Sequence, residues 1–334
     1  MKKKASKTTN GFPNGETPPY YLHQRFKKII PELFPCGARI YHYTSAEVLT
    51  KLAEDNAAFY ATHYLALNDN EEYDRGIRFV LDEYLPKRCR SVNCLLHKEL
   101  RELYQENKKK DELPKVWFLH TPWVVSFSRQ SDLLSQWVSY TDKGAGGVAI
   151  GYDFDKLEEV VGMTVRAKRA RSRFDDSSLD YEVQFLPCIY LDKKNPRRMR
   201  IVYKVLDLLF KDYFVRKAND FIKPKEKAIL AVAIVNLFGA IAKHPSFASE
   251  DEFRLVVLVG NKRFLKRGEF IGGKPRIRVP LREETAVRIN ALISDVCLSP
   301  HGDQGLLNDI ANFAKFKNDL KFEVRKSASS YNGR

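Results

Sequence analysis

The sequence predicts an α+β protein built on a mixed sheet that is flanked by helices. Short alternating or β-branched segments, typical of strands, are interspersed with amphipathic segments typical of helices. These segments lack the regular spacing of βαβ units that a doubly wound parallel sheet requires. The chain has 334 residues, of which 44% are hydrophobic and 12% aromatic, so it is long enough to bury a sizeable core. We therefore predict one domain over residues 21–334, behind a flexible basic tail at residues 1–20.

In the first half of the domain, strands are predicted where β-branched and aromatic residues gather, at residues 38–43, 59–62, 123–128 and 148–152. Helices are predicted at residues 23–33 and 46–54, from the polar turn at 67–70 to Tyr84, and at 133–140. The charged stretch at 86–115 is predicted to be a helical excursion on the surface. The glycine-rich turn at 143–147 lacks the GxGxxG spacing and the following helix of a phosphate-binding loop, so a hairpin turn is expected.

In the second half, a strand is predicted at 184–191, two helices after it, and strands at 253–259, 277–279, 293–298 and 322–325. A helix is expected before the final strand. The most apolar segment, residues 228–242, is too short to span a bilayer and is expected to be a buried helix.

Composition limits the partners and the compartment. The formal net charge is +15, which favours polyanionic partners, although a solvated basic surface explains it equally well. Five cysteines without a CxxC pair suggest reduced thiols rather than a disulfide framework or a zinc site. The basic N-terminus is not followed by an apolar stretch, so no secretory signal is expected. We expect a cytoplasmic protein that does not bind a membrane and has no metal site.

Two basic clusters are candidates for binding nucleic acid by neutralising its phosphates. They consist of Arg166, Lys168, Arg169, Arg171 and Arg173, and of Lys193, Lys194, Arg197 and Arg198.

Short blocks in a fixed order resemble domain-of-unknown-function family 2971, which consists of uncharacterised bacterial proteins. The blocks are Tyr41–Ser45, Leu67–Glu72, Ser126–Ser128 with Leu134–Tyr140, Gly147–Gly151, Lys243–Phe247 with Glu250–Arg254, and Val324–Ser327 with Tyr331 and Arg334. Phe253 stands where the family usually has Trp. The resemblance covers the chain from about Ile40 to its end and implies little about activity.

A second, remote resemblance is to the ADP-ribosyltransferase superfamily, which carries His, then Tyr or Ser, then Glu on separate strands of a split sheet. It implies a split antiparallel sheet, NAD as substrate and a nucleic-acid or protein target, with a toxin or phage-defence effector as the setting. His42 would hold the ribose, and Glu252, or Glu250 beside it, would stabilise the charge that develops as nicotinamide leaves. Either Tyr60 or Ser126 would be the middle residue. Further substrate- or cofactor-binding candidates are Tyr43, Thr44, Asn68, Asp69, Gln136, Tyr140 and Arg254.

Each candidate also has a structural interpretation. His42 lies on an apolar strand and can be a satisfied core residue, and Glu252 can form an ion pair with Arg254. Asn68 and Asp69 precede a helix, where an N-cap is expected. A non-catalytic basic module that binds nucleic acid or protein is therefore an alternative. A metal-dependent nuclease is another, with Asp69, Glu72, Glu250 and Glu252 as its acidic residues.

Overall fold

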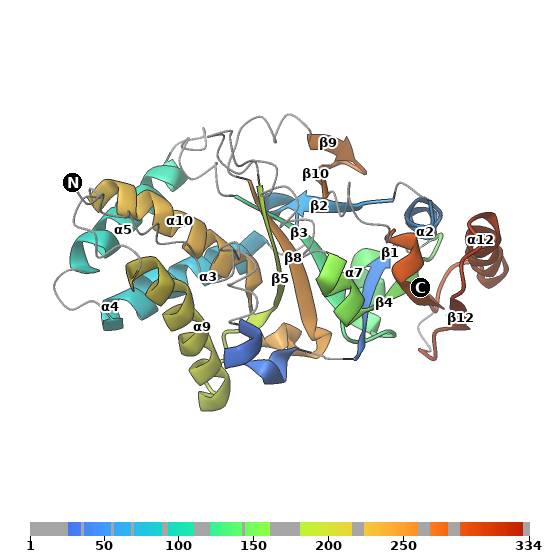
Figure 1. The fold of residues 1–334 in the computed structure, drawn as a ribbon, viewed down its shortest axis with the longest axis horizontal. Coiled ribbons are helices and arrows are strands. Elements are labelled where there is room, and N and C mark those ends of the chain that lie inside the picture. Colours follow the sequence, from blue (N-terminus) through green and yellow to red (C-terminus); the bar gives the residue numbers. More distant parts are fainter. Residues whose placement is uncertain are drawn as a thin grey trace, which may run out of the picture.

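The computed structural model describes residues 26–34, 37–54, 57–67, 70–88, 93–109, 121–141, 144–160, 181–215, 224–259, 268–279 and 288–329. In these ranges, ten strands form one sheet with the order β12-β11-β4-β1-β3-β2-β10-β9, and β8 and β5 branch from β3 (Figure 1). All of the sheet's strand pairs are antiparallel except the parallel pair β11–β12. The predicted α+β class, a mixed sheet flanked by helices, is confirmed.

The strands of this sheet are β1 (Arg39–Thr44), β2 (Phe59–His63), β3 (Pro122–Ser128), β4 (Val148–Asp153), β5 (Tyr181–Pro187), β8 (Glu252–Val259), β9 (Gly268–Ile271), β10 (Lys274–Val279), β11 (Ile293–Leu298) and β12 (Glu323–Lys326). A separate parallel pair joins β6 (Ile189–Tyr190) to β7 (Ala242–Lys243). The α-helices are α2 (Ala46–Leu52), α3 (Asn70–Arg78), α4 (Leu85–Arg88), α5 (Asn93–Lys109), α7 (Leu134–Tyr140), α9 (Pro196–Val215), α10 (Pro224–Ile241) and α12 (Gln304–Lys317). The π-helix η4 (Phe79–Tyr84) continues α3, and short 3-10 helices are η2 (Pro31–Leu33), η3 (Tyr64–Ala66), η5 (Pro245–Glu250) and η6 (Asn290–Leu292).

The sheet forks at β3. Along one edge, every residue of β3 pairs with β8. Along the other edge, β2 pairs with Trp123 and Val124 at the start of β3, whereas β1 pairs only with Ser128 at its end. Strands β1 and β2 therefore diverge from the same edge of β3 and leave the middle of that edge uncovered between them.

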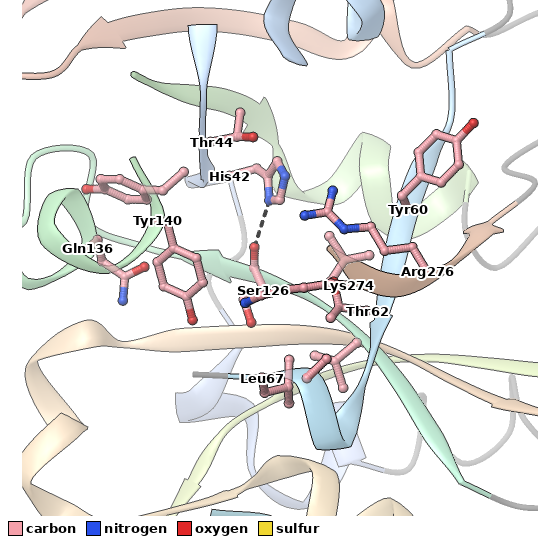
Figure 2. Close-up of a pocket in the computed structure, with 14 residues that line it drawn as sticks. His42, Thr44, Tyr60, Thr62, Leu67, Ser126, Gln136, Tyr140, Lys274 and Arg276 are labelled. Atoms are coloured by element: carbon pink, nitrogen blue, oxygen red, sulfur yellow. Dashed lines mark hydrogen bonds between the residues drawn. The ribbon is translucent and has the colours of Figure 1, made fainter. Parts of the chain in front are cut away.

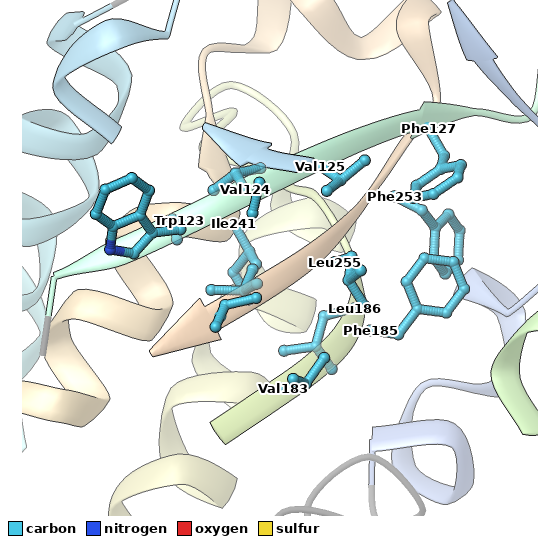
Figure 3. Close-up of a cluster of buried hydrophobic side chains, with 14 of the residues drawn as sticks. Trp123, Val124, Val125, Phe127, Val183, Phe185, Leu186, Ile241, Phe253 and Leu255 are labelled. Carbon is cyan, nitrogen blue, oxygen red and sulfur yellow. The ribbon is translucent and has the colours of Figure 1, made fainter. Parts of the chain in front are cut away.

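One part of the core lies on the side of the sheet that carries the odd-numbered residues of β3. Phe127, Phe185 and Phe253 from three adjacent strands meet there, with ring centroids 5.6 and 5.7 Å apart for the Phe127–Phe185 and Phe185–Phe253 pairs (Figure 3). Phe253 also packs edge-on against Phe154 at 5.2 Å, so this aromatic residue ties β8 to the segment that follows β4.

Helices α3, α9 and α10 lie together at one end of the sheet, and α2 and α12 lie at the other (Figure 1). The predicted apolar helix corresponds to α10, whose buried Asn236 accepts a hydrogen bond from the Tyr73 hydroxyl of α3 at 2.7 Å. Among the helices that the structure describes, none combines the length and the apolar character that crossing a membrane requires.

Three local predictions were wrong. The excursion at 86–115 is not confined to the surface, because Leu100 and Tyr104 of α5 are buried in the core. The strand predicted at 184–191 is interrupted at Cys188, and its two parts, β5 and β6, belong to different sheets. The glycine-rich turn does not connect a hairpin, because α7 precedes it and β4 pairs with β1 and β11.

Candidate functional site

A pocket with a volume of about 130 Å³ opens where β1 and β2 diverge from β3 (Figure 2). Side chains from β1, β2, β3, β10 and α7 converge on it. The lining residues are His42, Tyr43, Thr44, Tyr60, Thr62, Ala66, Leu67, Val124, Val125, Ser126, Gln136, Tyr140, Lys274 and Arg276. Seven of the predicted site residues are therefore brought together: His42, Tyr43, Thr44, Tyr60, Ser126, Gln136 and Tyr140.

His42 occupies the gap in the sheet. Its ring packs against Phe59 and Phe127, with centroids 5.9 and 5.5 Å away. Its Nδ1 lies 2.9 Å from the backbone oxygen of Ser126, on the uncovered edge of β3 (Figure 2). A carbonyl oxygen only accepts hydrogen bonds, so Nδ1 must carry a proton, and in the neutral ring Nε2 is then an acceptor. The fork thus fixes the tautomer of His42 and leaves Nε2 to accept a hydrogen bond from a ligand.

We expect His42 to be neutral at pH 7. Burial lowers its pKa from the ordinary value of 6.5, the hydrogen bond to Ser126 raises it, and the positive charge of Arg276 lowers it further. The Arg276→Gln variant should therefore show a higher His42 pKa than the parent protein. An NMR titration of the imidazole protons, with the signal assigned by its loss in His42→Gln, measures both values. A parent pKa above 6.5, or no increase in Arg276→Gln, contradicts this electrostatic account.

The pocket is cationic. Lys274 and Arg276 of β10 line it, and none of its described lining residues carries a carboxylate. Burial lowers the pKa of both side chains, and that of Lys274 is lowered further by the neighbouring Arg276. Neither residue is among the candidates named from the sequence. Their alternation in the segment Lys274-Pro-Arg-Ile-Arg-Val279 is the signal that places both on one face of a strand.

The two candidates for the middle residue both reach this pocket. Tyr60 lies at its rim, with 37% of its surface exposed. Ser126 contributes from the floor, on β3. The hydroxyl of Tyr43 is already used, because it donates to the backbone oxygen of Gln130 at 2.8 Å and accepts from the amide of Leu133 at 2.9 Å.

Glu250, Glu252 and Arg254 are not among the residues that line the pocket. They belong to a buried network with Glu72 and Lys243, which we call the ion network. Arg254 donates from Nε to Glu252 at 2.6 Å, from Nη2 to Glu72 at 2.8 Å and from Nη1 to the backbone oxygen of Ala240 at 2.7 Å. Lys243 donates to Glu250 at 2.6 Å and also to Glu252. All five side chains are buried, so the predicted Glu252–Arg254 pair is observed as part of a larger structural cluster.

Charge compensation explains how this cluster tolerates burial. Burial raises the pKa of Glu252, but Arg254 and Lys243 outweigh that effect and lower it to about 2. Burial also raises the pKa of Glu250, and Lys243 only partly opposes this. Tyr140 lines the pocket and is close enough to the ion network for the charge of Glu252 to affect its hydroxyl. Burial raises the pKa of its hydroxyl, and the charge of Glu252 raises it further.

The remaining predicted site residues lie elsewhere or outside the described residues. Asn68, Asp69, Arg166, Lys168, Arg169, Arg171 and Arg173 fall outside the described ranges. In the second basic cluster, two residues form ion pairs. Lys193 Nζ lies 2.6 Å from Glu83 Oε1, and Arg198 Nη1 lies 3.2 Å from Asp192 Oδ2. Within the described ranges, no group of three or more His, Cys, Asp or Glu residues is arranged to hold a metal ion.

Comparison with known proteins gives one match. Residues 136–255 match the model of a family described as "Protein of unknown function (DUF2971)". The chain is thus similar to this family from α7 to the middle of β8, which supports the resemblance seen in the sequence over that segment. No curated protein and no solved structure matches the chain.

Proposed function

We propose that the pocket at the fork of the sheet binds NAD and that the protein is an ADP-ribosyltransferase-like enzyme or an NAD-cleaving relative. The position of His42 carries this proposal. Because Nδ1 is held by the backbone oxygen of Ser126, Nε2 is available to accept a hydrogen bond from a sugar hydroxyl. The hydroxyls of Thr44, Tyr60 and Ser126 line the same pocket and are suited to a sugar that both donates and accepts hydrogen bonds.

The volume of the pocket restricts how NAD binds. At about 130 Å³ it is smaller than the roughly 300–1,000 Å³ of sites that enclose a drug-sized ligand. One part of the dinucleotide therefore occupies the pocket, and the rest extends through its mouth. The proposal assigns binding roles to His42, Tyr60 and Ser126.

The proposal does not place Glu252 in contact with the reacting sugar. Its carboxylate is saturated by Lys243 and Arg254, which leaves little negative charge to oppose a developing cation elsewhere. We assign Glu252 to the support of the pocket wall, beside Tyr140. Binding of NAD and its cleavage are accordingly tested as separate steps.

We expect His42→Ala to weaken NAD binding by roughly tenfold, because a net hydrogen bond contributes about 0.5–1.5 kcal/mol and the packing of the ring is lost as well. Calorimetry measures the affinity, and release of nicotinamide measures cleavage on the same preparations. His244→Ala is the matched control, because His244 caps η5 and forms its side-chain hydrogen bonds with Ser246, away from the pocket. Equal affinities of the parent and His42→Ala, or no binding by the parent, contradict the proposal.

The non-catalytic nucleic-acid module is the competing proposal. Its support within the described residues is the cluster around Lys193 and Arg198, whose charge is partly neutralised by Glu83 and Asp192. Binding of a DNA duplex that weakens steeply with salt, without binding of NAD, favours this alternative. The nuclease proposal is weaker, because Lys243 and Arg254 already provide Glu72, Glu250 and Glu252 with the positive charge that a metal would supply.

A further inference from the structure

We propose that Arg276 and Gln136, on opposite sides of the pocket, form an anion subsite that takes a phosphate group of the ligand. This inference refines the proposed function and rests on it for the identity of the ligand as a dinucleotide. The inference that an anion binds here rests on the Nε of Arg276 and the Nε2 of Gln136, which are buried without a hydrogen-bond partner among the described residues.

Arg276 is a partly buried cation without a counter-ion in the part of the chain that the structure describes. It forms no ion pair with any described residue, and its Nε is buried without a hydrogen-bond partner in the described part of the chain. Its guanidinium group extends from β10 toward His42 and into the pocket (Figure 2). Arg254 of the ion network differs from Arg276 in this respect, because it pairs with the carboxylates of Glu72 and Glu252. An uncompensated buried charge is costly, and a bound anion removes that cost.

Gln136 offers a second donor. Its side chain is only 3% exposed, it lines the pocket from α7, and its Nε2 has no hydrogen-bond partner within the described ranges. Buried amide groups are normally hydrogen-bonded, so an unpartnered one that faces a pocket indicates a ligand acceptor. A phosphate oxygen accepts from both a guanidinium and an amide group.

The surroundings favour an anion over other ligands. Lys274 lies two residues from Arg276 on the same face of β10 and adds a second positive charge. The absence of carboxylates among the described lining residues disfavours a metal ion or a cationic ligand. A planar guanidinium group matches the oxygens of a phosphate in a bidentate arrangement. The small volume favours one phosphate group of a small ligand over the continuous backbone of a polymer.

The test compares the parent with Arg276→Gln, Gln136→Leu and the control Arg278→Gln. Arg278 lies on the same strand, is exposed, and does not line the pocket, so its loss removes the same charge outside the subsite. Calorimetry is performed with pyrophosphate, ADP, NAD and the phosphate-free ligand adenosine.

We expect Arg276→Gln to weaken binding of pyrophosphate, ADP and NAD by roughly ten- to a hundredfold, the range for a hydrogen bond to a charged group. Gln136→Leu should weaken it by roughly tenfold. Arg278→Gln should change it by less than about threefold, because an exposed charge is screened. The melting temperature of Arg276→Gln should stay level or rise, since an unpaired, partly buried cation is removed. A purely structural arginine predicts a fall instead.

The outcomes separate this inference from the proposed function. NAD binding that is insensitive to Arg276→Gln overturns the anion subsite and leaves NAD binding intact. Arg276-dependent binding of pyrophosphate or ADP, without binding of NAD, supports the subsite and overturns the proposed function. Binding of a DNA duplex that is lost in Arg276→Gln, without binding of pyrophosphate, overturns the assignment to a small ligand. Failure of all four small ligands to bind the parent overturns both.

Discussion

Glu252→Gln is expected to destabilise the protein by about 3–5 kcal/mol, the range observed when one partner of a buried ion pair is removed. The substitution nearly preserves volume, so the loss arises from charge. Lys243 and Arg254 would remain buried with Glu72 and Glu250 as their only carboxylate partners among the described residues. Chemical denaturation at neutral pH measures the free energy of unfolding.

The effect should depend on pH with a definite sign. The pKa of Glu252 is lowered to about 2 in the folded protein, against an ordinary value of 4.5. A carboxylate whose pKa is lowered on folding contributes stability above its unfolded pKa and loses that contribution as the pH falls toward its folded pKa. The difference of about 2.5 pKa units corresponds to roughly 3 kcal/mol, at about 1.4 kcal/mol per unit. The stability difference between the parent and Glu252→Gln should therefore be largest above pH 4.5 and shrink between pH 4.5 and 2.

Glu47→Gln is the matched control. Glu47 pairs with Lys51 at 2.6 Å, but both side chains are exposed, and such pairs contribute about 0–1 kcal/mol. A loss in Glu252→Gln no greater than in this control refutes the structural role of the ion network. If a fully stable Glu252→Gln protein no longer releases nicotinamide, the result instead assigns Glu252 a catalytic role, as the ADP-ribosyltransferase resemblance implies.

The sequence predicts a strand at 253–259, which contains Arg254 and directly follows Glu252, but it does not predict what those residues contact. Alternation places both side chains on one face of β8 and makes their pairing a reasonable expectation. Their third partner, Glu72, lies on α3 and meets Arg254 only because α3 packs beside α10 and β7. A contact between residues so far apart in the chain depends on tertiary packing, which no local pattern contains. The burial of the whole cluster could not be predicted for the same reason.

The pocket illustrates the same limit. His42, Tyr60 and Ser126 were identified as candidates through the resemblance to the ADP-ribosyltransferase superfamily, and Gln136 was a further binding candidate. Arg276 was missed because it reaches the pocket through two strand pairings, β10 with β2 and β2 with β3, that bring a late segment beside an early one. The sequence of β10 indicates a basic face, but the neighbour of that face is set by strand order. The fork at β3 likewise depends on which strands share an edge.

The other large effect is expected at the wall of the pocket formed by α7. Trp137 is fully buried in a small cluster with Tyr41, Tyr43, Ala149 and Cys297 that is separate from the main core. Its ring lies edge-on to that of Tyr43, with centroids 4.6 Å apart. Its Nε1 donates to Asp132 at 2.7 Å. Trp137 is the fully buried side chain that α7 contributes to this cluster, and the partly buried Tyr140 of the same helix packs against it, so we infer that Trp137 is the main anchor of α7.

Trp137→Ala should cost about 3–5 kcal/mol, because it removes a large buried ring and leaves a cavity that α7 can only partly fill. The same carboxylate of Asp132 accepts from the Ser327 hydroxyl at 2.5 Å and the Ala328 amide at 2.7 Å, so the C-terminal segment should loosen as well. Trp137→Phe keeps most of the apolar contact and loses one hydrogen bond, so it should cost only about 1–3 kcal/mol. Val138→Ala, at a neighbouring position that is 41% exposed, should change stability by no more than about 0.5 kcal/mol.

The two readouts for this series are denaturation and ligand affinity at a temperature where every variant is folded. Gln136 and Tyr140 flank Trp137 on the same helix and line the pocket, so a displaced α7 should weaken binding of pyrophosphate and NAD in Trp137→Ala but not in Val138→Ala. Weakened binding in Trp137→Ala with normal binding in Trp137→Phe would show that ring volume, rather than the indole hydrogen bond, positions the helix. A Trp137→Ala protein as stable as the parent contradicts the assignment of Trp137 as the anchor of α7. If Trp137→Ala is destabilised but binds pyrophosphate and NAD as tightly as the parent, Trp137 stabilises the fold without determining the geometry of the pocket.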